Sequence, residues 1–434
     1  MKLYNLSHPE QQVSFSEAVR LGLGKGRGLF FPCDIPKLKD INVVLAMPFI
    51  ERSQYIIKQF LQGELDEAKV DAMVASAFNF DLPLVKVDGA RYCLELFHGP
   101  TLAFKDFGAR FMAQCINAVG DGKPLTILTA TSGDTGAAVA HAFHGLDNIK
   151  VVVLFPQGKI SVLQQKLFTT LGGNIHTLAI DGDFDACQEL VKQAFDDEDI
   201  RHGLGLNSAN SINISRLLAQ VCYYFEAVAQ FQVKHPNQAP IISVPSGNFG
   251  NLTAGMLAKA MGLPVARFIA ATNANDTVPR YLGDGNWRPN KTIATLSNAM
   301  DVAEPSNWPR VEACCDVMGW PLSSLLSASV ADKAASLELQ ALARGGYVSE
   351  PHAAIAAKAL TDTLAAQVDS EPKPLGIFLG TAHPAKFKEV VDSVLSCQLP
   401  LPQALAQVSD APCLAEPMAA DFAALKRYLF ARIV

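Results

Sequence analysis

The order of apolar and polar positions divides the chain into two parts. Up to about residue 80, apolar residues recur at helical spacing among ordinary surface charges, as in FIERSQYIIKQFLQGELDEAKVDAMVASAF. From about residue 85, short apolar runs alternate with glycine-marked turns and helical stretches, a pattern typical of strand–helix alternation around a parallel sheet. The sequence therefore predicts a mainly helical N-terminal cap (1–80) followed by an α/β region (81–390).

Seven apolar runs predict the strands of the α/β region. They are RYCLELF (91–97), LTILTA (125–130), KVVVLFP (150–156), NIHTLAI (174–180), IISVP (241–245), RFIAAT (267–272) and LGIFLG (375–380). Helical patterns lie between them, including FKDFGARFMAQCINAVG and ISRLLAQVCYYFEAVAQF. A mostly parallel sheet arrangement follows, since parallel strands need helical crossovers.

Two later regions depart from this alternation. A stretch rich in Pro, Asn and Trp starts near residue 275, and the chain is then largely helical and alanine-rich up to 367, which predicts a helical insertion or lid near 275–367. The proline-containing tail (391–434) is expected to wrap the surface and end in a short helix.

Composition and charge narrow the class of protein. The chain has 434 residues, of which 49% are hydrophobic and 18% charged, so a large globular core is expected. Thirty-six Lys and Arg against 42 Asp and Glu give a net charge of −6 without a basic run, which argues against nucleic acid as a partner. No signal-like start and no apolar run of membrane-spanning length occur, so we expect no membrane partner and a cytoplasmic location.

Cysteine and histidine spacing argues against two further classes. The nine cysteines form no C-x-x-C pair, and the nine histidines form no H-E-x-x-H cluster. We therefore expect neither a disulfide framework nor a metal.

Four segments combine glycine with small polar residues just after predicted strands. They are HGPTLAFKDFG (98–108), TSGDTGAA (131–138), PSGNFGN (245–251) and GTAHPAKF (380–387). Ligands of open parallel sheets bind at the carboxyl ends of the strands. The four segments together predict a ligand site.

Lys105 is the candidate reactive group among them. It stands between Phe104 and Asp106 at the start of a predicted helix, near further apolar residues. One interpretation is an ammonium group that reaches water beside core phenylalanines. The other is a lysine of lowered pKa, whose neutral amine suits Schiff-base formation.

The glycine loops are candidate anion sites. SGNFG offers a run of backbone N–H groups at a helix N-terminus, suited to a phosphate, although it matches neither of the common nucleotide-binding motifs. TSGDTG offers hydroxyls and N–H groups suited to a carboxylate. An ordinary strand-to-helix turn and simple helix capping are the alternatives.

The order and wording of six motifs resemble threonine synthase of the bacterial and fungal type. They are HGPTLAFKDFG, ATSGDTGAA, NSANSINISR, PSGNFGNLTAG, SEPHAA and LGTAHPAKF, and the likeness covers essentially the whole chain. The resemblance implies a pyridoxal-phosphate (PLP) enzyme of the tryptophan synthase β-like fold, fold type II. This fold is α/β, with two open, mostly parallel sheets flanked by helices and the cofactor in the cleft between them.

The resemblance also implies roles for individual residues. Lys105 would bind pyridoxal phosphate and then act as acid and base. The cofactor phosphate would be held by Ser246, Gly247, Asn248, Phe249 and Gly250. Thr381 would lie at the pyridine nitrogen. The substrate carboxylate would lie by Ser132, Asp134 and Thr135.

The implied reaction converts O-phosphohomoserine and water to threonine and phosphate, by elimination at Cγ and addition at Cβ. The leaving phosphate needs a second anion site, for which Arg216 is the first candidate because a guanidinium matches phosphate oxygens. A surface ion pair is the alternative for Arg216. Weaker candidates are Asn207, Ser211, Asn213 and Lys386. Glu350 and His352 in SEPHAA receive no role.

Three rival functions remain. A phospho-lyase of the same fold would release 2-oxobutyrate and ammonia from O-phosphohomoserine, and a serine or threonine dehydratase would share the fold. A phosphate- or nucleotide-binding regulatory protein would use the glycine loops without Lys105. The expected assembly is a monomer or a homodimer.

Overall fold

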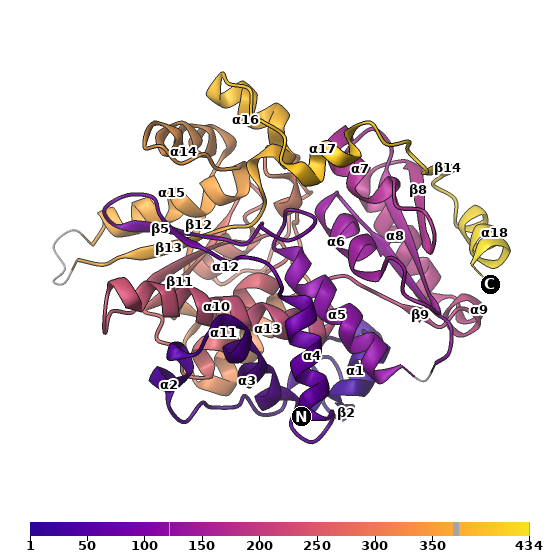
Figure 1. The fold of residues 1–434 in the computed structure, drawn as a ribbon, viewed down its shortest axis with the longest axis horizontal. Coiled ribbons are helices and arrows are strands. Elements are labelled where there is room, and N and C mark those ends of the chain that lie inside the picture. Colours follow the sequence, from indigo (N-terminus) through magenta and orange to yellow (C-terminus); the bar gives the residue numbers. More distant parts are fainter. Residues whose placement is uncertain (121, 368–372, 434) are drawn as a thin grey trace.

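The computed structural model describes residues 1–120, 122–367 and 373–433, which form two α/β lobes and an N-terminal unit (Figure 1). The strands are β1 (Lys2–Asn5), β2 (Gln12–Ser14), β3 (Phe30–Pro32), β4 (Leu84–Lys86), β5 (Arg91–Glu95), β6 (Leu125–Ala130), β7 (Ile149–Pro156), β8 (Ile175–Asp181), β9 (Leu206–Asn207), β10 (Ile241–Pro245), β11 (Arg267–Thr272), β12 (Leu326–Ser329), β13 (Gly376–Gly380) and β14 (Glu416–Ala419).

The helices connect and cover these strands. They are α1 (Phe15–Leu21), α2 (Ile41–Ala46), α3 (Phe49–Leu61), α4 (Glu67–Ala77), α5 (Lys105–Val119), α6 (Asp134–Phe143), α7 (Val162–Thr169), α8 (Phe184–Asp196), α9 (Glu198–Gly203), α10 (Ile214–Lys234), α11 (Gly250–Ala260), α12 (Thr277–Asp284), α13 (Trp308–Met318), α14 (Asp332–Arg344), α15 (Pro351–Ala365), α16 (Lys388–Leu395), α17 (Gln403–Ser409) and α18 (Phe422–Arg432). Short 3₁₀ turns lie at Lys25–Arg27, Asn298–Met300, Leu322–Ser324 and Pro384–Phe387.

The larger sheet has the strand order β12-β11-β10-β13-β5-β4 and is parallel except for the β4–β5 pair. Its central strands β10 and β13 are buried along their whole length. Their uninterrupted apolar sequences suit this position, because a parallel sheet is covered by helices on both faces. The order places the carboxyl ends of β5, β10 and β13 next to one another.

The smaller sheet has the order β14-β8-β7-β6-β9, and every neighbouring pair is parallel. The two sheets confirm the predicted α/β class. None of the helices in the described part of the chain combines the length and the apolar character that crossing a membrane requires.

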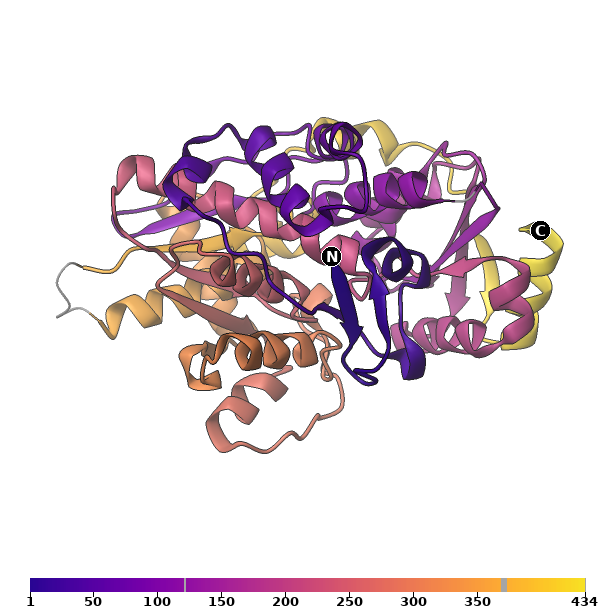
Figure 2. The same cartoon turned by 90° about the horizontal axis from the view of Figure 1, so that it is seen from below.

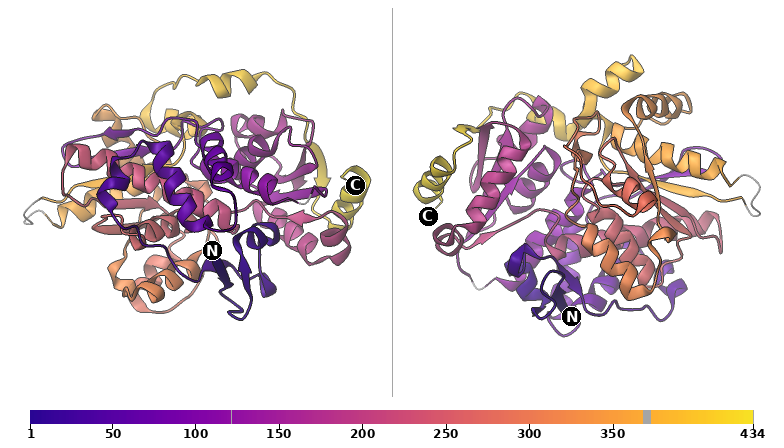
Figure 3. Two further views of the ribbon diagram at one scale, coloured as in Figure 1. Left: turned by 60° about the horizontal axis from the view of Figure 1, so that its bottom comes forward. Right: turned by 180° about the vertical axis from the view of Figure 1, so that it is seen from behind.

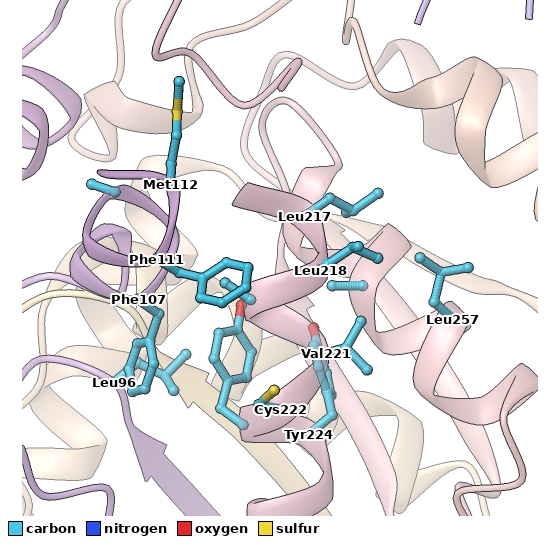
Figure 4. Packing of buried hydrophobic residues seen from close by; sticks show 14 of the residues in the cluster. Leu96, Phe107, Phe111, Met112, Leu217, Leu218, Val221, Cys222, Tyr224 and Leu257 are labelled. Atoms are coloured by element: carbon cyan, nitrogen blue, oxygen red, sulfur yellow. The ribbon is translucent and has the colours of Figure 1, made fainter. Parts of the chain in front are cut away.

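Helices α5 and α10 form the core between the lobes. The ring of Phe107 on α5 packs against that of Tyr223 on α10, with the centroids 5.4 Å apart. Figure 4 shows Phe107 and Phe111 on α5 beside α10, whose Leu218, Val221 and Tyr224 are also buried. Because α10 is apolar around most of its circumference, it is enclosed by other elements rather than presenting a polar face to water. This packing fixes the start of α5, where Lys105 lies.

The N-terminal unit is mainly helical, as predicted, but it also contains a three-stranded antiparallel sheet, β2-β1-β3, which the prediction missed. Figure 2 shows this small sheet beneath the two lobes, in indigo. Its strands are three or four residues long, too short for an alternating pattern to stand out in the sequence.

Two other predictions need correction. The region near 275–367 is not a purely helical insertion, because β12 pairs in parallel with β11 and extends the larger sheet. The tail does run over the surface and end in a helix, but it also supplies β14 to the edge of the smaller sheet. Figure 3 shows the tail, in yellow, crossing from one lobe to the other.

Candidate active site

All four predicted segments surround one cavity of about 1390 Å³. They follow β5, β6, β10 and β13, so the cavity lies at the carboxyl ends of strands from both sheets, as predicted. Predicted site residues that line it are Lys105, Ser132, Asp134, Thr135, Ser211, Arg216, Ser246, Gly247, Asn248, Phe249, Gly250 and Thr381. Asn207, Asn213 and Lys386 do not line it.

Lys105 is the first residue of α5 and points its amine toward the cavity without a hydrogen bond or ion pair to any described residue. The ring of Phe104 lies 5.9 Å from Nζ. Burial lowers the pKa of Lys105 to about 8; the Asp134 carboxylate opposes this shift, and Arg216 and Lys386 add to it. A substantial fraction of the amine is therefore neutral near physiological pH.

The loop after β10 forms an anion-binding nest. The N–H groups of Gly247, Asn248, Phe249 and Gly250 find no acceptor among the described residues, and they precede the first turn of α11. Gly247 is required here, because a Cβ atom would lie 2.7 Å from the Cα of Met300. Four free donors and the positive end of a helix dipole suit a phosphate.

The loop after β6 forms a second nest at the start of α6. Thr131 Oγ1 accepts the N–H groups of Gly133 (2.9 Å) and Gly136 (2.8 Å) and so fixes the turn. The hydroxyls of Ser132 and Thr135 line the cavity and bond to nothing in the described chain. These groups can receive a carboxylate.

Asp134 forms an ion pair with Lys386, which lies behind the cavity. Its Oδ1 atom lies 2.6 Å from Nζ of Lys386, and both side chains are buried. Although burial opposes it, the charges of Lys386 and Lys105 and a hydrogen bond from Lys386 lower the pKa of Asp134 to about 2. Lys386 also donates to the carbonyl of Thr101 at 2.8 Å, so it holds two loops together.

Arg216 is buried without a carboxylate in the described chain. One terminal nitrogen donates to the carbonyl of Ala209, whereas Nε has no partner. Burial lowers the pKa of Arg216 to about 10, which leaves it charged at neutral pH. Arg216 lines the cavity, and a buried guanidinium without a carboxylate partner suits an anionic ligand.

Asn251 is a cavity residue that sequence reasoning missed. Its Oδ1 accepts from the hydroxyls of Tyr223 and Tyr224, each at 2.6 Å, and its Nδ2 has no partner. The residue is 7% exposed and follows the phosphate nest directly. Its place at the end of the SGNFGN motif was the signal that could have found it.

Asn207 and Asn213 stabilise the segments that surround the cavity. We call these segments, with Lys386 and Arg310, the frame. Both side-chain amides donate to the carbonyl of Val19 at 3.1 Å, and Asn213 also caps α10. Ser211 accepts from Asn248 Nδ2 at 2.8 Å and so connects this segment to the phosphate nest. The segment thus joins the N-terminal unit to the cavity wall.

Arg310, a second buried arginine, was also missed. It donates to the carbonyls of Phe30 (3.1 Å) and Ile212 (2.8 Å) and to Asn307 Oδ1 (2.9 Å). Its contacts fix the segment that carries Ser211 against α13 and β3. No motif marked it, because its role depends on which three segments meet in space.

The free amine of Lys105, the phosphate nest and Thr381 fit the aldehyde, phosphate and ring nitrogen of pyridoxal phosphate. This fold and site define a PLP-dependent enzyme. A family model described as pyridoxal-phosphate dependent enzyme matches residues 80–378. Models for the N terminus and the C-terminal part of threonine synthase match residues 7–78 and 353–429.

The chain is 62% identical to the threonine synthase of Haemophilus influenzae and 59% identical to that of Escherichia coli K12, with 99% of each chain covered. The crystal structure of Escherichia coli threonine synthase superposes with a TM-score of 0.94 at 58% identity, covering 99% of this chain and 100% of that one. A PLP-bound threonine synthase from Brucella melitensis gives 0.89 at 32% identity, covering 99% and 98%. The chain belongs to the threonine synthase family of PLP-dependent lyases, and it acts on a small-molecule substrate.

Proposed function

We propose that the enzyme converts O-phosphohomoserine and water to threonine and phosphate. The observation that carries this proposal is the presence of two cationic side chains without a carboxylate partner among the described residues, Lys105 and Arg216, in one cavity that also contains a separate phosphate nest. One anion site serves the phosphate of the cofactor. The second suits a phosphorylated substrate, since a buried guanidinium without a carboxylate is stabilised when a phosphate binds.

Each loop binds a different part of the cofactor or of the substrate. Donors of Gly247 to Gly250 hold the cofactor phosphate, with Ser246 setting the start of the loop through its bond to Ala271 O at 2.8 Å. Thr381 faces the ring nitrogen. Ser132 and Thr135 receive the substrate carboxylate, while Asp134 orients that loop through Lys386.

Arg216 receives the phosphate that leaves the substrate. Asn251 and Ser211 line the same cavity. Asn207, Asn213 and Lys386 act through position rather than contact, because their side-chain nitrogens already donate to protein groups and none of the three residues lines the cavity.

When bound, pyridoxal phosphate stabilises negative charge at substrate Cα and, through conjugation, at Cβ. Lys105 removes one proton from Cα and one from Cβ. In the second half of the reaction one proton is returned to Cα and one is delivered to Cγ, which becomes the methyl carbon of threonine, and the proton released by the attacking water balances the one that the leaving phosphate takes up. The bond from Cγ to the phosphate oxygen breaks, and a water oxygen bonds at Cβ. Arg216 offsets the charge of the departing phosphate.

The pKa of Lys105 suits proton transfer in both directions. At a pKa of about 8, neither the neutral nor the charged amine is rare near physiological pH. The apolar surroundings of the amine, with Phe104 beside it, limit the access of water before phosphate has left.

The test of the proposed function follows three products in one reaction mixture. Phosphate, threonine and 2-oxobutyrate are measured after adding O-phosphohomoserine to the PLP-loaded enzyme and to Lys105→Ala. We expect equal amounts of phosphate and threonine, and neither product with the variant. Phosphate accompanied by 2-oxobutyrate would assign the enzyme to the phospho-lyases, which the comparisons do not favour.

We further propose a cytoplasmic location and a monomer or homodimer. The acidic net charge of −6 favours a freely diffusing enzyme over one attached to anionic surfaces. Analytical ultracentrifugation of the PLP-loaded enzyme measures the assembly, and a species larger than a dimer would contradict the proposal.

A further inference from the structure

The active-site cavity extends beyond the reactive groups into a part that the proposed chemistry does not use. This part, which we call the outer chamber, is lined by residues of the N-terminal unit, including the loop 24–29, and by residues of α8 and α9. Its charged side chains are exposed, whereas Arg216 is buried. The outer chamber is therefore the part of the cavity that opens to solvent.

The outer chamber is strongly cationic. Among the described residues that line it, Asp196 is the one acidic residue, and five are basic: Arg20, Lys25, Arg27, Lys192 and Arg201. The chain as a whole has 36 basic and 42 acidic residues. The excess of positive charge is therefore a local feature of the opening rather than a property of the whole surface.

Three of these cations are available to a ligand. The side chains of Arg20, Lys25 and Lys192 form no ion pair or hydrogen bond with a described residue, whereas Arg27 pairs with Asp196. Solvated surface charge is the ordinary interpretation of such side chains. The construction of the two walls that carry them favours a ligand instead.

Helix α8 forms one wall of the outer chamber. One face of this helix lines it, with Phe184, Gln188, Val191, Lys192, Phe195 and Asp196 at helical spacing. Lys192 and Asp196 are one turn apart on that face, and Asp196 pairs with Arg27 from the opposite wall. Cations from both walls therefore face the same space.

The loop that carries Lys25 and Arg27 forms the opposite wall and is built around a buried side chain. Asn5 is fully buried, and its amide donates to the carbonyl of Lys25 (2.9 Å) and to Gln11 Oε1 (2.8 Å). The same Gln11 oxygen accepts the N–H group of Lys25 at 2.8 Å. Gly28 is required here, because a Cβ atom would lie 1.8 Å from Asn5 Oδ1. The backbone of the loop is thus fixed, and its two basic side chains stand at the opening.

The outer chamber is also joined to the wall that carries Arg216. The side-chain amide of Asn207 donates to the carbonyls of Val19 (3.1 Å) and Arg20 (2.9 Å). Asn213, which caps the helix that contains Arg216, donates to the same Val19 carbonyl at 3.1 Å. The cations of the opening and the buried guanidinium are therefore held in a fixed relation along one cavity.

We propose that the outer chamber is an entrance that attracts the phosphorylated substrate, with Lys25 and Lys192 acting from its two walls. The inference rests on the proposed function, in which the substrate is O-phosphohomoserine. The phosphate of this molecule carries close to two negative charges at neutral pH, and the rest of it is a zwitterion. A cationic opening raises the rate at which such an anion reaches Arg216. Threonine has no phosphate, so the entrance favours the substrate over the product.

The experiment measures how fast the substrate associates with the PLP-loaded enzyme. Stopped-flow absorbance of the cofactor follows the association of O-phosphohomoserine at about 10 mM and about 1 M salt, where the Debye length is about 30 Å and about 3 Å. At low salt, we expect Lys25→Gln and Lys192→Gln each to lower the association rate constant about twofold, and the double variant about fourfold. At high salt, all three should match the unaltered enzyme.

Asp196→Asn should change the rate in the opposite direction. The substitution removes the one acidic residue of the described lining and leaves the charge of Arg27 unpaired. The association rate constant at low salt should therefore rise about twofold. A fall would contradict an entrance that acts through charge.

Two kinds of control separate charge from other effects. Lys37→Gln removes one exposed positive charge from the same N-terminal unit at a position that does not line the cavity, and it should leave the association rate unchanged. Lys25→Arg and Lys192→Arg keep the charge at the opening and should associate as fast as the unaltered enzyme. Arginine variants as slow as the glutamine variants would refute the entrance.

The outcomes distinguish the inference from the proposed function. If the unaltered enzyme forms threonine but the double glutamine variant associates at low salt as fast as Lys37→Gln, the entrance is refuted and the proposed function stands. If the unaltered enzyme forms no threonine, the proposed function fails. The entrance is then judged with pyridoxal phosphate, another phosphate-bearing anion, added to the cofactor-free protein. Slower attachment in the double variant would support the entrance, and equal rates would refute it.

Discussion

The cavity wall and the frame behind it each contain a lysine and an arginine that are wholly or partly buried, but the polar groups of the two regions differ in their partners. On the wall, the Lys105 amine and the Arg216 Nε atom have no partner within the described residues. In the frame, Lys386 pairs with Asp134, and Arg310 donates to four protein oxygens. Lysine and arginine side chains therefore stabilise the fold in the frame, whereas on the cavity wall they are available to bind a ligand.

The difference follows from the cost of burying a charge. An ion removed from water is stabilised only by close partners, and a protein that leaves such a group unpaired reduces its own stability. Burial lowers the pKa of Lys105 to about 8 and that of Arg216 to about 10. On the cavity wall, binding of an aldehyde or a phosphate offsets this loss of stability. The unpaired cations there therefore serve ligand binding rather than folding.

Lys105→Ala should cause the largest effect, a loss of kcat of about a thousandfold or more, because proton transfer and attachment of the cofactor both depend on this amine. Threonine formation measured with excess pyridoxal phosphate checks it. The free energy of unfolding of the cofactor-free protein should not fall, since no partner loses a contact. A large loss of stability would show that Lys105 stabilises the fold, as the frame residues do, and would contradict this prediction.

Asp134→Asn should destabilise the protein by about 3 kcal/mol, because it leaves the ammonium of Lys386 buried without its anion. Urea unfolding of the cofactor-free protein measures the change. The double variant Asp134→Asn, Lys386→Met should be less destabilised than Asp134→Asn alone.

Asp362→Asn provides the surface comparison for that measurement. Asp362 pairs with Lys358 on the exposed side of α15, and losing this pair should cost less than about 0.5 kcal/mol. If both asparagine variants lost the same small amount, the Lys386–Asp134 pair would not be a frame contact.

Arg216→Met should lower kcat/KM for the phosphorylated substrate about a hundredfold, the effect of losing a charge-assisted contact. Its stability should stay the same or rise, since an unpaired buried cation is removed. Arg310→Met should behave in the opposite way, with reduced stability because four oxygens lose their donor. Steady-state kinetics and urea unfolding of both variants, side by side, separate the two arginines.

The pH dependence of cofactor attachment is a further expected effect. Because the pKa of Lys105 is lowered from 10.5 to about 8, its neutral fraction grows as pH rises through 8. The rate at which added pyridoxal phosphate attaches to the cofactor-free enzyme should rise about tenfold between pH 7 and pH 9 and then level off. Stopped-flow absorbance follows the attachment, and a rate that is flat over this range would contradict the lowered pKa.

The lowered pKa of Lys105 also predicts how the free energy of unfolding changes with pH. Between pH 8 and 10.5 the unfolded chain still binds the proton that folded Lys105 has released. The free energy of unfolding of the cofactor-free protein should therefore gain a rising contribution across this window, and the contribution should be absent in Lys105→Met.

The parts of the fold that could be predicted are those encoded by continuous local patterns. The strands LTILTA, IISVP and RFIAAT were predicted with the bounds that β6, β10 and β11 have, because buried parallel strands are uninterrupted apolar runs bounded by turns. Strands such as β9 and β12 were missed. They are two and four residues long and exist only because a neighbouring strand pairs with them.

The residues of the site also fall into those that a local sequence pattern marks and those that only distant contacts define. The glycine loops and Lys105 have a local signature, so they could be located from the sequence. Whether a buried ion meets a partner depends on distant segments, which is why Lys386 was taken for a substrate ligand and Arg310 and Asn251 were passed over. Asn207 and Asn213 share a motif with Arg216, yet their amides reach Val19 in the N-terminal unit.

Chemical labelling distinguishes Lys105, which lines the cavity, from Lys386, which is paired behind it. The PLP-loaded enzyme is reduced with borohydride, which makes the bond between cofactor and lysine permanent, and its peptides are analysed by mass spectrometry. The account predicts the added mass of the reduced cofactor on Lys105 and none on Lys386. Label on Lys386, or on neither lysine, would contradict the distinction between an unpartnered reactive wall and a partnered frame.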